Sequence, residues 1–378
     1  MIVIADDITG AAEIAGIAFS RGEQVRLVCG DGTAIDGITV IATETRSMSE
    51  AEAVAETQRI VSHITPLTSL TSGQSVTSQS HLFKKTDSAL RGHVVAELAA
   101  LMKTTGYQRT VYLPANPSKG RIIKDGVYYV NNVPIHETAF NYDPEFPAKT
   151  SVLKERFPDA EARGIIMPDA ENEEDIQDVV AKYNDGKTLF AGAADLFAAV
   201  LNANHGDRPS HLSPLTSHLS PLTSHPSPLT SHLILCGSTQ SKPLDIGIPV
   251  APMPRDIYDG SNDMNLWDTS SYVEAHSLIL TMPYTHRTGK EAAVHLRTMM
   301  AMKARQLVTE HCPQHLIIEG GATAWTTLQA LGWTAFTITA QFAPGVVQMS
   351  ATNGTLVTLK PGSYPWGALN PKASSLEP

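Results

Sequence analysis

Apolar runs of strand length alternate with stretches of helical periodicity through the first half of the chain. This pattern predicts strands at 1–5, 24–30, 37–43, 81–87 and 109–116, and helices at 9–22, 47–64 and 88–106. Such alternation is typical of a parallel sheet covered by helices. Because ligands of open parallel sheets bind beyond the carboxyl ends of the strands, polar residues at those ends are the first functional candidates.

The second half of the chain shows the same alternation. Here the pattern predicts strands at 232–238, 276–282, 315–321, 335–341 and 354–362, and helices at 289–311 and 323–332. Between the halves, residues 211–231 read HLSPLTS, HLSPLTS and HPSPLTS, and the proline in each repeat excludes a continuous helix. We interpret this segment as a flexible or extended linker, in preference to a proline-rich ligand for an SH3-like module.

The two halves together predict an α/β protein of two domains, each a mostly parallel sheet flanked by helices. We expect the first domain at 1–205, the linker or insertion at 206–232 and the second domain at 233–378. A chain of 378 residues with 42% apolar and 17% charged residues can form two such cores.

Charge and cysteine content narrow the class of protein. The formal net charge is −10, and no basic run is interleaved with aromatic residues, which argues against a nucleic-acid surface. No apolar run has the length of a membrane span. The start, MIVIADD, lacks the basic residues and the long apolar stretch of a signal peptide, so we expect a cytoplasmic protein. Its cysteines, Cys29, Cys236 and Cys312, are then expected to be reduced thiols, and no Cys/His spacing indicates a metal site.

The first polar strand end is the segment VIADDITGAAE. Asp6 and Asp7 directly follow a predicted strand, Thr9 is a good N-cap for the next helix, and Gly10 lets the backbone approach a ligand. The two aspartates could simply cap the helix. Two in succession at a strand end favour a cation, a hydroxyl ligand or a basic partner.

The segment FKKTDSALRG is the second. Its helical spacing predicts a helix that begins near Ser88 or Ala89 and is capped by Asp87 or Ser88, with Arg91 in its first turn. Lys85 lies at the preceding strand end. Cations for an acid group, next to carboxylates that accept hydroxyl groups, suit a small polyhydroxy acid. The alternative is an exposed, solvated turn.

Two further strand ends carry basic residues. Arg46 in TETRS could bind a carboxylate with both arms of its guanidinium, or could be a surface arginine. Arg121 follows the loop PANPSKG and is a candidate for substrate binding. A hairpin predicted around Asn131 and Asn132 could cover a substrate or form the contact of a homodimer.

In the second half, strand ends carry glycines and hydroxyls in place of charges. Turns of this kind before helices bind phosphates through backbone N–H groups. The candidates are Ser238, Gly320, Gly321, Ala322, Thr323 and Gly362. The chain has neither a P-loop motif nor a G-x-G-x-x-G after a strand.

Nine segments, in order along nearly the whole chain, resemble the four-carbon acid sugar kinase family: ADDITGAAE, TETRS, KKTDSALRG, PANPSKGR, GVYYVNNVPIHET, CGS, EGGATA, APG and LKPG. The resemblance implies an N-terminal substrate domain, a C-terminal nucleotide domain and an active site in the cleft between them. It implies phosphorylation by ATP and magnesium of the terminal (C4) hydroxyl of threonate, erythronate or 3-oxo-tetronate. The family's substrate residues match Asp6, Asp7, Thr9, Arg46, Lys85, Asp87, Ser88 and Arg91, and its nucleotide residues match Ser238, Gly320, Gly321, Thr323 and Gly362.

In the mechanism expected from this resemblance, arginines and a lysine hold the substrate carboxylate, with Arg91 as a contact. Asp7 or Asp87 orients the terminal hydroxyl and accepts its proton. The segments GSTQSKP and KPGSYPWG depart from the family's pattern. They leave open a sugar-acid-binding protein that has lost ATP chemistry. A third reading, an NAD-dependent dehydrogenase, is disfavoured by the missing dinucleotide motif.

Overall fold

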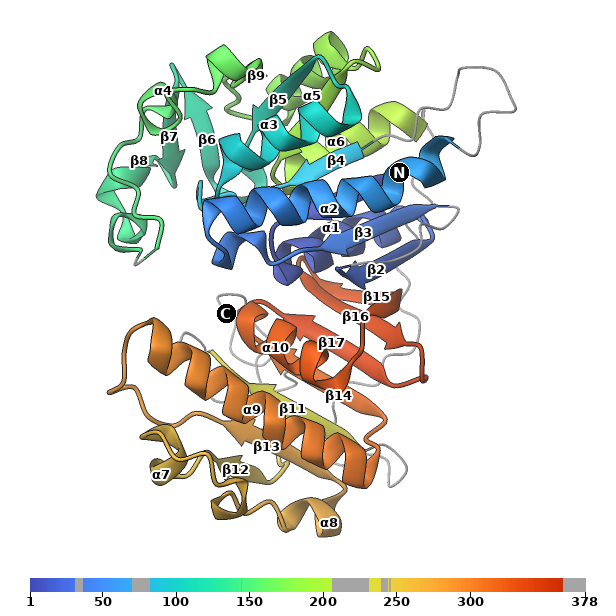
Figure 1. Cartoon of the computed structure of the whole chain (residues 1–378), viewed down its shortest axis with the longest axis vertical. Helices are drawn as coiled ribbons and strands as arrows, with labels where there is room; N and C mark the ends of the chain where they lie inside the picture. The colour runs from blue at the N-terminus through green and yellow to red at the C-terminus, as the bar shows by residue number, and fades with distance from the viewer. Residues whose placement is uncertain are drawn as a thin grey trace, which may run out of the picture. The chain divides into compact units, whose positions relative to one another are not determined.

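The computed structural model describes residues 1–30, 37–69, 82–143, 145–205, 231–238, 244 and 246–362 (Figure 1). Contacts divide the chain into two compact units, Met1–His211 and Leu212–Pro378. The repeat at 211–230 and most of GSTQSKP and SYPWG lie outside the described residues. The α/β class that we expected is confirmed in both units.

The first unit is built on a fully parallel sheet with the strand order β2-β3-β1-β4-β10-β5-β9. Its central strands are buried on both faces, as a sheet covered by helices requires, and β1 is wholly apolar whereas β4 ends in two buried lysines. The strands are β1 Ile2–Ala5, β2 Val25–Cys29, β3 Ile38–Ala42, β4 Leu82–Lys85, β5 Arg109–Leu113, β9 Ile165–Ile166 and β10 Thr188–Gly192.

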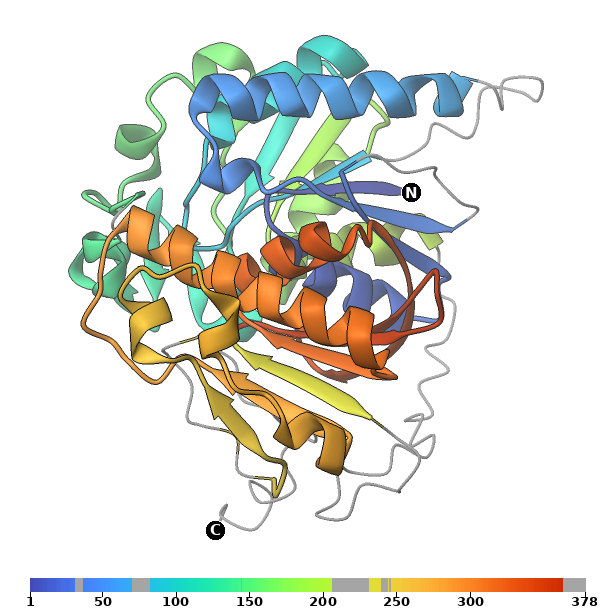
Figure 2. The same ribbon diagram turned by 60° about the horizontal axis from the view of Figure 1, so that its bottom comes forward.

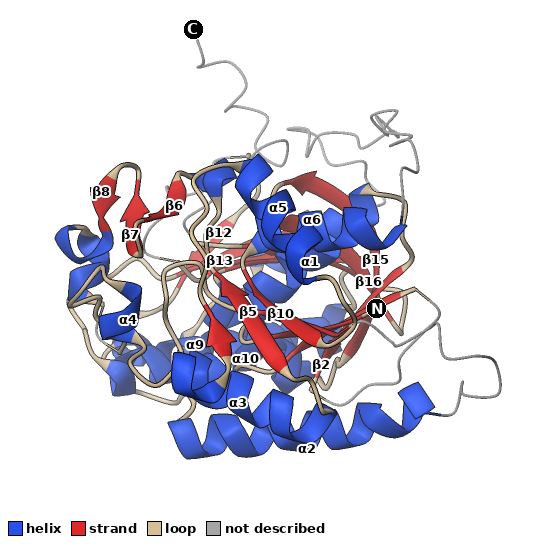
Figure 3. Ribbon diagram, turned by 90° about the horizontal axis from the view of Figure 1, so that it is seen from above, coloured by secondary structure: helices blue, strands red, loops and turns tan. Residues whose placement is uncertain are grey.

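Helices cover both faces of this sheet (Figure 3). Helices α2 and α3 pack together on one face, and α1, α5 and α6 lie on the other. Their bounds are α1 Ile8–Ser20, α2 Glu50–Ser69, α3 Val94–Thr105, α5 Glu173–Tyr183 and α6 Ala194–His205. Parallel pairing then brings the ends of β1, β3 and β4, with the polar residues that follow them, to one edge of the sheet.

A small antiparallel sheet with the order β6-β7-β8 extends this unit. Asn131 and Asn132 both have positive φ, 49° and 65°, so the predicted hairpin is confirmed as a tight two-residue turn. The elements of this region are η2 Pro117–Lys119, β6 Arg121–Lys124, β7 Val127–Val130, β8 Val133–Pro134, η3 Ile135–Glu137, η4 Ala139–Tyr142, α4 Leu153–Arg156 and η5 Glu161–Arg163.

The second unit has a mixed sheet with the strand order β12-β13-β11-β14-β17-β16-β15. The first five strands in this order, β12, β13, β11, β14 and β17, run parallel to one another. Strand β16 pairs antiparallel with β17, and β15 pairs antiparallel with β16. The strands are β11 His232–Cys236, β12 Val250–Pro252, β13 Ser277–Thr281, β14 His315–Glu319, β15 Ala335–Ala343, β16 Val346–Ala351 and β17 Leu356–Lys360.

Two helices of the second unit, α9 Lys290–His311 and α10 Gly321–Leu331, pack side by side on this sheet (Figures 1 and 2). Shorter helices follow β12: α7 Arg255–Tyr258, η6 Met264–Leu266 and α8 Ser271–Ala275. Among the cysteines, Cys29 is buried, Cys236 half-buried and Cys312 exposed, and all are free thiols. No helix within the described residues is both long and apolar enough to cross a membrane.

Two local predictions were wrong. The helix expected from Ser88 or Ala89 begins only at Val94, because Leu90 and Gly92 have φ of 64° and 95°, which a right-handed helix does not accommodate. Arg91 therefore lies in a turn and not in the first turn of the helix. The N-cap of α1 is Asp7 and not Thr9.

Candidate active site

Asp6 and Asp7 leave β1 in different environments. Asp6 is 2% exposed, and burial raises its pKa above the ordinary value. Asp7 is half-buried and caps α1, where it accepts hydrogen bonds from Gly10 N at 2.8 Å and from the Thr9 hydroxyl at 2.5 Å. Burial opposes ionisation of Asp7, but Arg46 and the Thr9 hydroxyl outweigh it, so its pKa is lowered.

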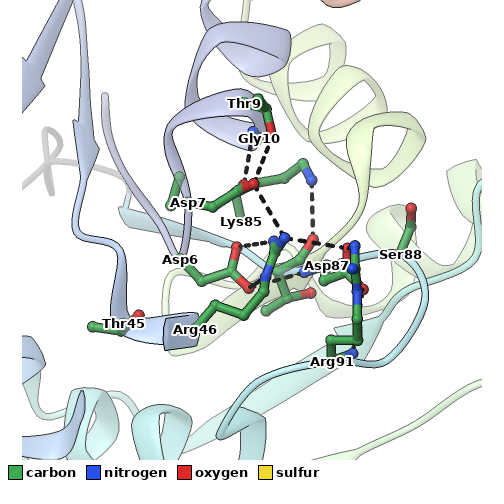
Figure 4. Close-up of polar contacts among 12 residues, drawn as sticks. Asp6, Asp7, Thr9, Gly10, Thr45, Arg46, Lys85, Asp87, Ser88 and Arg91 are labelled. Carbon is green, nitrogen blue, oxygen red and sulfur yellow. Dashed lines mark hydrogen bonds and ion pairs between the residues drawn. The ribbon is translucent and has the colours of Figure 1, made fainter. Parts of the chain in front are cut away.

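Arg46 lies at the centre of the polar cluster, on the short helix η1 Thr45–Ser47 that follows β3. Its guanidinium binds both oxygens of Asp6, at 2.9 and 3.2 Å, and Asp7 at 3.1 Å. Asp87 is 3.7 Å away. Figure 4 shows the three aspartates pointing toward this one side chain. The pKa of Arg46 lies well above its ordinary value despite burial, because three carboxylates surround it.

Asp87 is held by the turn that follows β4. Arg91 binds both oxygens of Asp87 at 2.9 Å, and Ala89 N donates to the same carboxylate at 2.9 Å. Asp87 N in turn donates to Asp6 at 3.2 Å. Burial acts against the charged carboxylate, but Arg46 and Arg91 more than compensate and lower its pKa strongly. The segment FKKTDSALRG thus forms an ordered, ion-paired turn.

Two lysines share a fourth carboxylate, that of Glu13. Glu13, on the first turns of α1, lies 3.5 Å from the Lys85 amine and also bonds Lys119 of the PANPSKGR loop. Burial disfavours its charge, but the two lysines lower its pKa. Lys85 further donates to Thr86 O at 3.0 Å. We call Asp6, Asp7, Glu13, Arg46, Lys85, Asp87, Arg91 and Lys119 the acid–base cluster.

Glu44 lies beside this cluster and has both a left-handed backbone conformation and a raised pKa. Its φ is 53°, and its carboxyl accepts from Ile8 N at 3.0 Å. Burial, and then the neighbouring charge of Asp7, raise its pKa to about 8. At neutral pH Glu44 is therefore largely protonated beside an ionised Asp7.

A buried ion pair lies beneath the cluster. The Lys84 amine and Glu97 are 2.6 Å apart, with side chains 1% and 2% exposed. The Thr45 hydroxyl donates to the same Glu97 carboxylate at 2.9 Å. This pair therefore ties β4 and α3 to the short helix that carries Arg46.

Ser88 lies between the acid–base cluster and the small sheet. The Arg121 guanidinium donates to the Ser88 hydroxyl, and the Tyr128 hydroxyl donates to Ser88 O at 2.5 Å. Both Ser88 and Arg121 are half-buried. The first unit thus brings together all the substrate residues that the sequence predicted: Asp6, Asp7, Thr9, Arg46, Lys85, Asp87, Ser88, Arg91 and Arg121.

In the second unit, three turns meet at the ends of β11, β14 and β17. Cys236 pairs in register with Glu319, and Glu319 with Lys360, so the turns that follow are neighbours. A Cβ added at Gly237 would lie 2.1 Å from the Thr323 hydroxyl oxygen, and one at Gly362 would lie 2.4 Å from that of Ser238. The side chains of Thr323 and Ser238 therefore pack directly against the backbone of these two glycines.

The N-terminus of α10 opens onto these turns. Gly320 is its N-cap, with φ of 94° and no side-chain cap, so the first N–H groups, at Gly321, Ala322 and Thr323, have no acceptor within the helix, as is general for the N-termini that bind anions. Beneath them Lys360 and Glu319 form a second buried ion pair at 2.6 Å. All six predicted nucleotide residues lie in these turns or in the first turn of α10.

Sequence reasoning did not assign roles to several residues of the first unit. Glu97 could have been found, because it falls on the apolar stripe of α3, three residues after Val94 and four before Leu101. A charge on such a stripe indicates a buried partner. Glu13 and Lys119 are far apart in the sequence, so a local sequence pattern could not have predicted that they form an ion pair.

No group of three or more histidine, cysteine or acidic side chains suited to a metal ion occurs within the described ranges.

Comparisons with known proteins agree with this division of chemistry. A family model described as a sugar-binding N-terminal domain matches residues 1–159, and one described as a nucleotide-binding C-terminal domain matches residues 276–364. A 3-oxo-tetronate kinase of Brucella melitensis is 25% identical, covering 96% of this chain and 92% of its own. A D-threonate kinase of Salmonella typhimurium is 30% identical over 41% of this chain and 35% of its own.

A crystal structure of a Haemophilus influenzae protein has a similar fold, with a TM-score of 0.69, 20% identity and full coverage of both chains. The two domain models together match most of the chain, and the segments DD-x-TG and KTDS-x-LRG fall within the first of them. The chain belongs to the four-carbon acid sugar kinase family.

Proposed function

We propose that this protein is a kinase that uses ATP to phosphorylate the C4 hydroxyl of a four-carbon sugar acid, such as threonate, erythronate or 3-oxo-tetronate. The observation that carries the proposal is the meeting of Asp6, Asp7, Asp87 and Arg91 around Arg46 at one sheet edge. Carboxylates of this kind accept hydrogen bonds from sugar hydroxyls. The kinase name of a relative that matches 96% of this chain supports the same reaction class.

Asp7 is better suited than Asp87 to orient the reacting hydroxyl. One oxygen of Asp7 accepts a single bond, from Gly10 N, and the side chain is half-buried. Both oxygens of Asp87 are occupied by Arg91. Since a carboxylate offers about four acceptor sites, Asp7 retains room for a substrate hydroxyl. Phosphoryl transfer depends mainly on positioning and charge stabilisation, so a base of lowered pKa can still serve.

The second unit would hold ATP. The Thr323 and Ser238 side chains pack against Gly237 and Gly362 and so hold the three turns together, and the N–H groups of Gly321 to Thr323 suit phosphate oxygens. ATP supplies the phosphoryl group, and magnesium neutralises charge on it. Most magnesium ligands would be phosphate and water oxygens, which Mg²⁺ commonly retains.

A coupled assay of ATP consumption over threonate, erythronate and 3-oxo-tetronate tests the proposal. At least one acid should stimulate ATP turnover. Asp7→Asn should lower kcat by about 10²–10⁴-fold and leave ATP binding unchanged. Asp185→Asn is the matched control, because Asp185 pairs with Arg109 at the other end of β5. An ATP site that no four-carbon acid stimulates would contradict the proposal.

A further inference from the structure

A bound sugar acid brings one carboxylate, which needs a cation that no protein carboxylate already neutralises. None of the four cations of the acid–base cluster meets this condition. Arg46 binds Asp6 and Asp7, and Arg91 binds both oxygens of Asp87. A substrate carboxylate would have to displace one of these pairs, which leaves a buried aspartate without its partner.

The two lysines are likewise engaged. Lys85 and Lys119 flank Glu13, and the Lys85 side chain is 4% exposed. Asp143 also lies 3.6 Å from Arg91, which adds a second acid to that guanidinium. The cations of the cluster therefore serve first to hold its own carboxylates in place.

Arg121 differs from all of them. Its recorded side-chain partners are neutral: the Ser88 hydroxyl, and the Phe140 ring, whose centroid lies 5.6 Å from the guanidinium carbon. Within the part of the chain that the structure describes, no carboxylate lies within ion-pair distance of Arg121, and its Nε and Nη2 donate no hydrogen bond. A guanidinium with free donors can bind a carboxylate with two parallel bonds.

The backbone of Arg121 is held in place by hydrogen bonds. Its backbone exchanges two hydrogen bonds with Asn116, at 2.7 and 3.2 Å, and the buried Asn116 side chain accepts from Asp195 N at 3.0 Å. Ser88 adjoins Asp87 in the chain and is itself held by Tyr128. A half-buried charge is thus held against Ser88, the residue that follows Asp87 in the chain.

Arg156 is the other nearby arginine without an acid partner, but its donors are occupied. It bonds Leu90 O at 2.9 Å and Pro147 O at 3.1 Å. Its task is to hold the turn that carries Arg91.

We infer that Arg121, steadied by Ser88 and Phe140, binds the carboxylate of the substrate, and that Arg46 and Arg91 are positioning residues for the aspartates. This inference rests on the proposed function, and it assigns the selectivity of the kinase for acids over neutral sugars to Arg121. It replaces Arg91, the contact expected from the sequence, as the carboxylate anchor.

The test compares threonate with its neutral amide, threonamide, by isothermal titration calorimetry on the full chain. Arg121→Met keeps an unbranched apolar side chain about as long as the arginine stem and removes the charged guanidinium. It should weaken threonate binding about ten- to a hundredfold, and leave threonamide binding within about twofold. Arg121→Lys keeps the positive charge but cannot form two parallel hydrogen bonds. Its affinity for threonate should therefore lie between those of the parent and of Arg121→Met. Arg109→Met, in the same unit but paired with Asp185, should match the parent.

Equal losses for threonate and threonamide in Arg121→Met would show a merely structural role and overturn the inference, as would unchanged binding of threonate. If Arg121→Met does not fold, Arg121→Lys and Ser88→Ala decide by the same ratio of acid to amide affinity. Should the parent bind no four-carbon acid, the proposed function itself fails. A parent that binds and phosphorylates the acid, with no change in the variants, sinks only the role of Arg121.

Discussion

The two units use the same strand-end location for opposite chemistry. In the first unit the edge carries charged side chains locked in ion pairs, as around Arg46. In the second it carries turns so close that Gly237 has no room for a Cβ. Side chains select among small hydroxyl-bearing acids by position, whereas backbone N–H groups bind phosphate oxygens of any nucleotide. Under the function proposed above, we therefore expect mutations to separate specificity for the acid from binding of the triphosphate.

Both edges rest on a buried lysine–glutamate pair, Lys84–Glu97 in one unit and Lys360–Glu319 in the other, each at 2.6 Å. Removal of one partner leaves a charge in the core, so Glu97→Ala should lower the free energy of unfolding by about 3–5 kcal/mol. Lys360→Met should have an effect of similar size. Denaturant titration measures both.

The double replacement Lys84→Met with Glu97→Leu is the control, and it should recover most of the stability because no lone charge remains. If Glu97→Ala unfolds at the denaturant concentration of the parent, the pair does not contribute as its burial indicates.

Gly237→Ala and Gly192→Ala form a matched pair of glycine replacements. The new Cβ would lie 2.1 Å from the Thr323 hydroxyl oxygen in one and 2.0 Å from Leu113 O in the other. Gly237→Ala should weaken ATP binding at least about tenfold and spare acid binding, since overpacking of this kind costs about 1–3 kcal/mol. Gly192→Ala should do the reverse, because Gly192 O accepts from Thr86 N beside the cluster. Calorimetric titration of each variant with ATP and with the acid measures both affinities. If either variant binds both ligands more weakly, the two sites are not separable in this way.

The sequence located these edges well, because strand alternation fixes where parallel strands end and polar residues there are easily seen. It failed at Leu90, whose spacing to Val94 is helical although its backbone is left-handed. Apolar periodicity reports which side of a chain is buried and not the sign of φ. The partnership of Arg91 with Asp87 was equally hidden, since both were expected to face a ligand. Long-range pairs such as Glu13 with Lys119 depend on how loops fold over the sheet.

Acid should weaken the second unit through His315. Burial lowers its pKa to about 3 from an ordinary 6.5, so the folded protein keeps it neutral while the unfolded chain takes up a proton. Stability is complete above pH 6.5 and falls between 6.5 and about 3, by about 1 kcal/mol for each unit. His315→Gln should flatten this slope in thermal melts, and His63→Gln, at an exposed position, should not.

Raising the pH should lower the stability of the first unit through Glu44, whereas lowering the pH destabilises the second unit through His315. Its folded pKa of about 8 exceeds the ordinary 4.5, so the folded state binds the extra proton, and stability falls as the pH rises between these values. Because Glu44 is partly exposed, we expect less than the full value of about 1.4 kcal/mol for each unit of this shift. Glu44→Gln should remove it, and an unchanged slope between pH 5 and 8 would refute the assignment.

Deletion of 211–230 should have the smallest effect, because the proline repeat shows no periodic apolar face. Ser231 is kept, since its hydroxyl accepts from Gln314 N at 3.0 Å. The thermal midpoint and both ligand affinities should match those of the parent. A large loss in either would show that the repeat packs against a unit or sets their spacing.

The uneven exposure of the cysteines makes the chain convenient for site-selective labelling. Burial raises the pKa of the Cys29 and Cys236 thiols to about 12, so neither offers a reactive thiolate at neutral pH. Cys312 is exposed directly after α9. A maleimide dye should therefore attach at Cys312 first without any engineered change, and place a fluorescent reporter on the second unit alone.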